Sequence, residues 1–138
     1  FTQSRVEHNF KCDIEAARTV MESRIPISIL DLPSSQKTII RIEEIEQIAK
    51  APRIGALLYS EIMSWILPRK QNWTIPHDPM VVLALLNPEF FETSDSGVAK
   101  INMDGMSFWS GSELGNVQLL NPIHSELAVK KMIELITN

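Results

Sequence analysis

The stretch TIPHDPMVVLALLNPEFF, residues 74–91, places a His-Asp pair between two prolines and follows it with a nearly unbroken apolar run. Asp is favoured at a helix N-cap because its carboxylate accepts hydrogen bonds from the free backbone N–H groups of the first turn. Pro fits the first helical position, where an N–H would have no partner. The stretch therefore predicts a buried helix that begins at Asp78-Pro79. On these residues alone, Asp78 is a helix cap and His77 a loop residue.

The composition is typical of a single globular domain, which we expect over residues 1–138. Apolar residues make up 44% and charged residues 22%, and the net charge of −4 gives no electrostatic argument for nucleic acid or anionic membrane. The longest apolar run, Met80–Leu86, is far shorter than the roughly 20 residues that span a bilayer. Cys12 is the only cysteine, so no internal disulfide forms, which fits a cytoplasmic protein.

Hydrophobic periodicity predicts a helix, a strand, three helices, a small antiparallel part and a closing helix. Asp13 is a candidate cap for the first helix, and Asp104-Gly105 is a hairpin signal. The expected helices cover 12–23, 38–50, 53–67, the His-Asp stretch and 124–136, and the strands fall within 24–33, 97–109 and 116–120. The predicted class is α/β with an appended antiparallel hairpin region.

A second group of polar residues, Glu7 and Asn9, lies ahead of the first helix. In an extended segment, residues two apart project to the same side. A carboxylate and a carboxamide facing one place would offer acceptors and donors for sugar hydroxyls. The alternative interpretation is a solvated loop, because Glu-x-Asn is a common sequence. There is no glycine-rich phosphate loop, Cys/His metal-finger spacing or Gly-x-Ser-x-Gly elbow.

Taken together, these segments resemble the inosine-uridine-preferring nucleoside hydrolase family. The resemblance rests on Glu-x-Asn before an Asp-x-Glu-Ala-Ala helix, on HDP at 77–79 about seventy residues later, and on NPEFF at 87–91. The strand PISILDLP and the later INMDG stretch fall in the family's order. The resemblance implies the second half of an open sheet with helices, so residues 1–138 would be the C-terminal portion of a longer hydrolase.

The family resemblance also implies roles for four residues. Asp78 would bind a Ca²⁺ ion that also holds the ribose 2′- and 3′-hydroxyls, so it counts as both metal ligand and substrate-binding residue. His77 would help to protonate the departing base. Glu7 and Asn9 would hold ribose hydroxyls. These roles agree with the preference of calcium for oxygen ligands and with histidine as a general acid.

Two departures from the family pattern limit this interpretation. His8 stands where the family has Phe, so an apolar wall beside the sugar becomes polar and the fit of the substrate changes. The family's N-terminal Asp-x-Asp-x-Gly-x-Asp-Asp signature, which supplies most calcium ligands and the carboxylate that activates water, is missing. One aspartate cannot supply the roughly six to eight oxygens of a calcium site, so the site is incomplete in this chain.

Two further residues have weaker assignments. Trp65 has a possible stacking role against a base, with core packing as the alternative. His124 stands before Ser125 at a predicted helix start, in a capping region.

The predicted function is the C-terminal portion of a nucleoside hydrolase that cleaves ribonucleosides to base and ribose and is inactive alone. The alternative is a non-catalytic, stand-alone or degenerate domain for assembly or ligand binding. Since half of a sheet would expose apolar surface, the expected partner besides the nucleoside is a second copy or the missing N-terminal half.

Overall fold

The computed structural model describes residues 6–138, and the contacts along the chain divide it into two compact units. The first unit comprises residues 1–34 and 92–121, and the second comprises residues 35–91 and 122–138. The interpretation of the whole chain as one domain stays a prediction.

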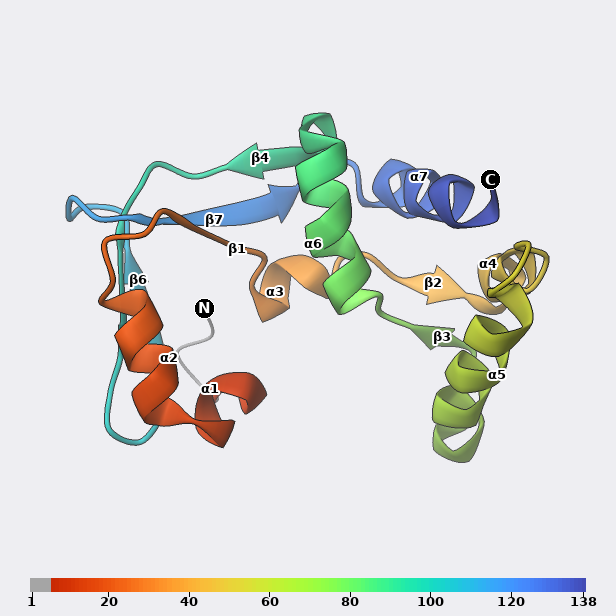
Figure 1. The fold of residues 1–138 in the computed structure, drawn as a ribbon, viewed down its shortest axis with the longest axis horizontal. Helices are drawn as coiled ribbons and strands as arrows, with labels where there is room; N and C mark the ends of the chain where they lie inside the picture. The colour runs from red at the N-terminus through yellow and green to blue at the C-terminus, as the bar shows by residue number, and fades with distance from the viewer. Residues whose placement is uncertain (1–5) are drawn as a thin grey trace. The chain divides into compact units, whose positions relative to one another are not determined.

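The first unit is built on a three-stranded sheet in which β7 lies between β1 and β4 (Figure 1). The strands β1 and β7 are parallel and pair Ile27 with Val117. A separate antiparallel pair is formed by β5 and β6. The elements that lie wholly or mostly in this part of the chain are α1 (His8–Cys12), α2 (Ile14–Met21), β1 (Ile27–Ile29), α3 (Leu32–Ser35), β4 (Phe91–Thr93), β5 (Val98–Ile101), β6 (Ser107–Ser110) and β7 (Val117–Pro122).

The helix α2 begins where the sequence predicts. The Asp13 carboxylate accepts a hydrogen bond from the Ala16 backbone N–H at 2.9 Å, which satisfies a free donor of the first turn. Helical spacing would place Ala16, Ala17, Val20 and Met21 on one apolar face, but the face that packs inward differs, because Val20 is 53% exposed. The inward side chains are instead Ile14, Ala17 and Met21, which pack with Ala99, Ile101 and Val117.

The predicted hairpin at Asp104-Gly105 is confirmed, since β5 and β6 pair from Val98 with Ser110 to Ile101 with Ser107. Gly105 has φ +85°, a backbone conformation that glycine adopts without a Cβ penalty. Alternation also holds along β5, where Ala99 and Ile101 are buried and Lys100 is exposed.

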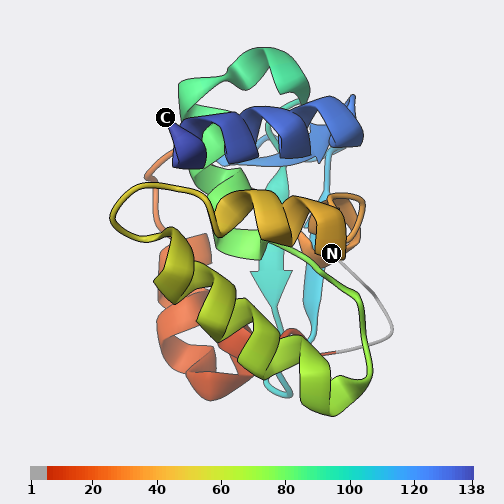
Figure 2. The same ribbon diagram turned by 90° about the vertical axis from the view of Figure 1, so that its right-hand side faces the viewer.

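The second unit is mostly helical, with one short antiparallel pair between β2 and β3. Figure 2 shows α7 alongside α4, and α5 following from α4, in agreement with the packing of α4 on both helices. The elements are β2 (Ile40–Arg41), α4 (Ile42–Ile48), α5 (Gly55–Ile66), the 3₁₀ turn η1 (Leu67–Arg69), β3 (Trp73–Thr74), α6 (His77–Leu86), the 3₁₀ turn η2 (Pro88–Phe90) and α7 (Ser125–Thr137).

The helix predicted at 38–50 has isoleucines three apart, at positions 39, 42, 45 and 48, a spacing that suits one helical face, but they do not all lie in one helix. The helix α4 starts only at Ile42, and Ile45 and Ile48 are buried at 0% and 2% exposure. The two residues before it form β2 instead, in which Ile40 is buried, and Ile39, just ahead of the strand, is 36% exposed. The pairing of β2 with β3 explains this difference, because a partner distant in sequence takes residues that local periodicity assigns to the helix.

The helix α6 corrects the expectation of a buried apolar segment. Met80, Leu83 and Ala84 are buried, while Val82 and Leu85 are 55% and 79% exposed. The α/β class with a small antiparallel part is confirmed by the observed elements. Within residues 6–138, no helix is both long and apolar enough to cross a membrane.

Candidate functional site

The helix α6 begins at His77 rather than at Asp78. Its N-cap is Pro76, and Asp78 and Pro79 occupy the second and third helical positions. Pro79 is tolerated there because the first-turn N–H groups lack acceptors within the helix. The prediction of Asp78 as the helix cap is therefore wrong. Its carboxylate lies in the first turn, where the helix dipole favours a negative charge, and the residue is exposed.

The His77 ring is held by a serine from a distant part of the sequence. Ser35 Oγ lies 2.9 Å from His77 Nδ1, a hydrogen-bonding distance. Ser35 is buried, with 2% exposure, whereas His77 is exposed. The exposed ring is therefore anchored at one nitrogen by a buried hydroxyl.

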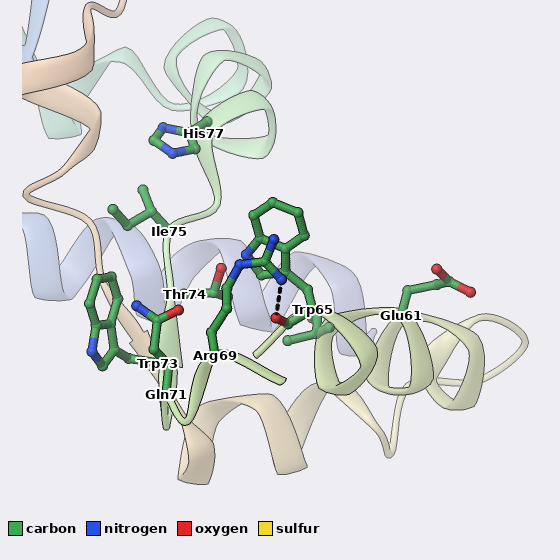
Figure 3. Close-up of a pocket in the computed structure, with 9 residues that line it drawn as sticks. Glu61, Trp65, Arg69, Gln71, Trp73, Thr74, Ile75 and His77 are labelled. Carbon is green, nitrogen blue, oxygen red and sulfur yellow. Dashed lines mark hydrogen bonds between the residues drawn. The ribbon is translucent and has the colours of Figure 1, made fainter. Parts of the chain in front are cut away.

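His77 also lines a cavity of about 630 Å³ (Figure 3). The walls come from α5, η1, β3 and the segment that leads into α6. Figure 3 shows the His77 ring at one end, with Trp65, Arg69 and Trp73 further along. The lining residues are Glu61, Ile62, Trp65, Arg69, Gln71, Trp73, Thr74, Ile75 and His77.

Within this cavity, Trp65 and Arg69 form a stacked pair. The Arg69 guanidinium carbon lies 3.4 Å from the centre of the Trp65 ring, and Arg69 Nη1 donates to the Trp65 carbonyl at 2.7 Å. The contact is a cation–π interaction that also satisfies a carbonyl at the end of α5. Trp65 is 55% exposed, so it does not belong to the core of this unit.

The geometry predicted for Glu7 and Asn9 is wrong. Glu7 is the N-cap of α1, and its Oε2 accepts a hydrogen bond from the Phe10 backbone N–H at 3.0 Å. Asn9 is the second residue of that helix and is exposed. Residues two apart on a helix do not face one another, so the extended arrangement does not form. The Glu7 carboxylate is instead used to cap the helix.

The four predicted residues thus lie in two pairs. His77 and Asp78 are neighbours in the first turn of α6 in the second unit, and Glu7 and Asn9 lie at the N-cap and the second position of α1 in the first unit. His8, between the latter two, is exposed, and its Nε2 lies 3.8 Å from Cys12 Sγ.

The described residues do not fit the implied calcium ion. Within residues 6–138, no three or more His, Cys, Asp or Glu side chains cluster in a way that could hold a metal. Calcium needs about six to eight oxygen ligands, of which Asp78 is one candidate.

Sequence reasoning missed Ser35 and Arg69. Arg69 follows Trp65 by four positions, a spacing that places side chains on one helical face, so this pair had a local signal. Ser35 had no local sequence signal, because its partner His77 is 42 positions away.

The comparison with protein families decides the assignment. The model of the inosine-uridine preferring nucleoside hydrolase family matches residues 2–130. The chain belongs to this family. The resemblance found in the sequence is thereby confirmed.

Individual relatives agree with the family assignment. The pyrimidine-specific ribonucleoside hydrolase RihA of Shewanella baltica is 35% identical over 98 residues, which cover 67% of this chain and 31% of that protein. RihA of Photobacterium profundum is 31% identical over 126 residues, which cover 86% of this chain and 40% of that protein. The chain therefore spans about a third of the length of these relatives, and it matches their C-terminal part.

Solved structures agree on the fold. A plant nucleoside hydrolase superposes with a TM-score of 0.81 at 15% identity, covering 95% of this chain and 47% of that one. The purine-preferring ribonucleoside hydrolase from Gardnerella vaginalis superposes with a TM-score of 0.76 at 16% identity, covering 96% of this chain and 46% of that one. The predicted nucleoside-hydrolase-like fold is thus confirmed.

Proposed function

We propose that the chain is the C-terminal part of a nucleoside hydrolase that cleaves the N-glycosidic bond of ribonucleosides. The observation that carries the proposal is the anchored His77 at one end of an aromatic-walled cavity. Membership of the family and the match to about a third of two ribonucleoside hydrolases support the same reaction.

The cavity is the proposed site of the base. Its volume of about 630 Å³ lies within the range of about 300–1,000 Å³ that ligand pockets occupy. The exposed Trp65 and the half-buried Trp73 offer ring faces for stacking a flat heterocycle. Because Arg69 lies against one face of Trp65, the stacking surface left for a base is the opposite face or the ring of Trp73.

His77 is the proposed general acid. Hydrolysis breaks the bond between the sugar C1′ and a base nitrogen, and the bonding electrons leave with the base while water adds to C1′. A proton delivered to the base makes it a better leaving group. The ring reaches from the first turn of α6 into the cavity wall, so it is positioned at the site where we place the base.

The roles of Glu7, Asn9 and Asp78 in binding ribose and calcium are also proposals. Glu7 and Asn9 are proposed to hold ribose hydroxyls, for which Glu7 would have to share a carboxylate that now caps α1. Asp78 is proposed as the single calcium ligand from the described residues. The other ligands would lie outside these residues, which is why we expect the chain to be inactive by itself.

Release of free base tests the proposal. The natural protein that carries this chain is incubated with uridine and with inosine, and the base is quantified by chromatography. We expect hydrolysis of one or both, and His77→Ala to lower kcat by about 10²–10⁴-fold, the usual contribution of a general acid. His124→Ala removes an exposed histidine outside the cavity and should change nothing.

The rival function is a non-catalytic domain for assembly or ligand binding. It is favoured by the lack of a metal-binding cluster among residues 6–138. If the natural protein released no base from either nucleoside in the presence of calcium, the rival would replace our proposal. Base release by the isolated 138-residue chain would instead contradict the inferred incompleteness of the site.

A further inference from the structure

A serine outside the cavity lining lies within hydrogen-bonding distance of one ring nitrogen of His77. Ser35 Oγ and His77 Nδ1 are 2.9 Å apart, and both residues belong to the second unit. A ring nitrogen in a hydrogen bond with a protein hydroxyl is not available to a ligand. The nitrogen that remains for a bound molecule is Nε2.

The backbone of Ser35 is itself held by hydrogen bonds from Thr38. Its carbonyl accepts two hydrogen bonds from Thr38, one from Oγ1 at 2.7 Å and one from the backbone N–H at 3.0 Å. Thr38 is fully buried, and the next residues lead into β2, which pairs with β3 shortly before His77. The segment from Ser35 to β2 thus connects to the segment of His77 at two points, through the strand pair and through the Ser35 hydroxyl.

We propose that Ser35 is a positioning residue that engages Nδ1 of His77 and presents Nε2 as the atom that exchanges a proton with the ligand. The inference rests on the proposed function of His77. An exposed imidazole at the first position of a helix has few packing contacts to fix its ring. A hydrogen bond with a buried group selects one ring orientation, because only that orientation aims Nδ1 at Ser35.

A purely structural role is the competing explanation, since a buried hydrogen bond also stabilises the start of α6. The two explanations differ in their readouts. A structural role predicts lower stability with unchanged chemistry in the folded fraction. A positioning role predicts a change at the ring nitrogens and in kcat, with KM unchanged, because the acid acts in the transition state.

The first experiment needs only the 138-residue chain. Long-range ¹H–¹⁵N correlation spectra at a fixed pH, at which the imidazole is neutral, report which nitrogen carries the proton and whether Nδ1 is hydrogen-bonded. We expect Nδ1 of His77 to be hydrogen-bonded in the wild type and to shift to the free-imidazole pattern in Ser35→Ala. Ser34→Ala removes the neighbouring buried hydroxyl and should leave the pattern unchanged.

The inference is wrong if the Nδ1 signal is the same in Ser35→Ala as in the wild type, or if Ser34→Ala changes it equally. Should Ser35→Ala not fold, Ser35→Cys carries the test, since a thiol keeps most of the volume and is a weak hydrogen-bond donor. The shift should then move in the same direction by a smaller amount, and an unchanged signal would again overturn the inference.

The second experiment measures kinetics in the natural protein that carries this chain. Ser35→Ala should lower kcat about two- to tenfold, the range of a single neutral hydrogen bond, with KM unchanged. Ser34→Ala should match the wild type. If the natural protein releases no base, the proposed function fails, and if His77→Ala retains full activity, the proposed role of His77 as general acid fails. In both cases the spectra still decide whether Ser35 orients the ring. If His77→Ala is inactive and Ser35→Ala is not impaired, the positioning role alone fails.

Discussion

At the scale of single residues, His77 and Asp78 are neighbours with different surroundings. His77 has a buried partner for one ring nitrogen and lines the cavity. Asp78 is an exposed member of the first turn of α6 and does not cap it. A substitution of each residue should therefore affect different quantities, kcat for His77 and ligand binding for Asp78.

We predict that Asp78→Asn leaves the fold intact and weakens calcium binding. The change removes a charge near a helix N-terminus, which costs about 0.3–1 kcal/mol of stability. If the carboxylate is a calcium ligand in the natural protein, calcium affinity should fall about 100-fold or more, because even loss of an outer-shell partner costs about 10–100-fold. KM should rise as well, since a ligand acts on the bound complex.

Calorimetric titration with calcium measures the affinity, and thermal unfolding measures the stability. Asp95→Asn, an exposed aspartate of the first unit, is the control and should alter neither. Unchanged calcium affinity in Asp78→Asn would remove Asp78 from the metal site and leave it as a charge that favours the helix.

At the scale of elements, each helix start reflects either a local signal or a distant partner. The start of α2 is local, because Asp13 binds the N–H of Ala16 three positions later. The start of α6 is not local, because β3 pairs with β2 and leads the chain to an N-cap at Pro76, two residues before the Asp78 cap that the Asp-Pro sequence suggests.

We predict that Asp13→Ala lowers the free energy of unfolding by about 1 kcal/mol, the usual effect of losing an N-cap. The hydrogen bond at 2.9 Å to Ala16 is lost, and the first turn of α2 keeps an unsatisfied donor. Asp13→Asn should cost little, because Asn caps about as well as Asp. Urea unfolding followed by circular dichroism measures both variants. Equal losses in the two would point to the charge rather than the cap.

These examples explain what the sequence could predict. Asp13 and Asp104-Gly105 act within a few residues, so α2 and the β5–β6 hairpin followed from the sequence. The short strands β2, β3 and β4 did not, because strands of two or three residues exist only through their partners. The same reasoning applies to the site, where His77 stood in a recognisable sequence and Ser35 did not.

At the scale of the whole molecule, the main feature is the apolar surface that remains exposed to water on α6. The second unit buries Ile45, Ile66 and Met80 fully or nearly so, yet it leaves large apolar side chains of α6 in water. Val82, Leu85 and Leu86 are 55%, 79% and 65% exposed, and their spacing places them on one face of the helix. Contiguous exposed apolar surface favours association.

We predict that the isolated chain self-associates through this face of α6 and that Leu85→Glu reduces the association. A carboxylate at the most exposed position of the face would have to be desolvated in any contact between copies, which opposes binding. Leu83 of the same helix is buried, so Leu83→Ala should instead destabilise the fold by about 2–5 kcal/mol without a selective effect on association.

Multi-angle light scattering over a range of concentrations measures the mass. Leu114→Glu is the matched control, because it makes the same chemical change at a fully exposed leucine outside α6. The wild type and Leu114→Glu should associate with rising concentration, while Leu85→Glu should remain closer to the mass of one chain. A wild type that stays monomeric at high concentration would contradict the prediction, and an equal effect of the two glutamates would show that net charge, not the α6 face, controls association.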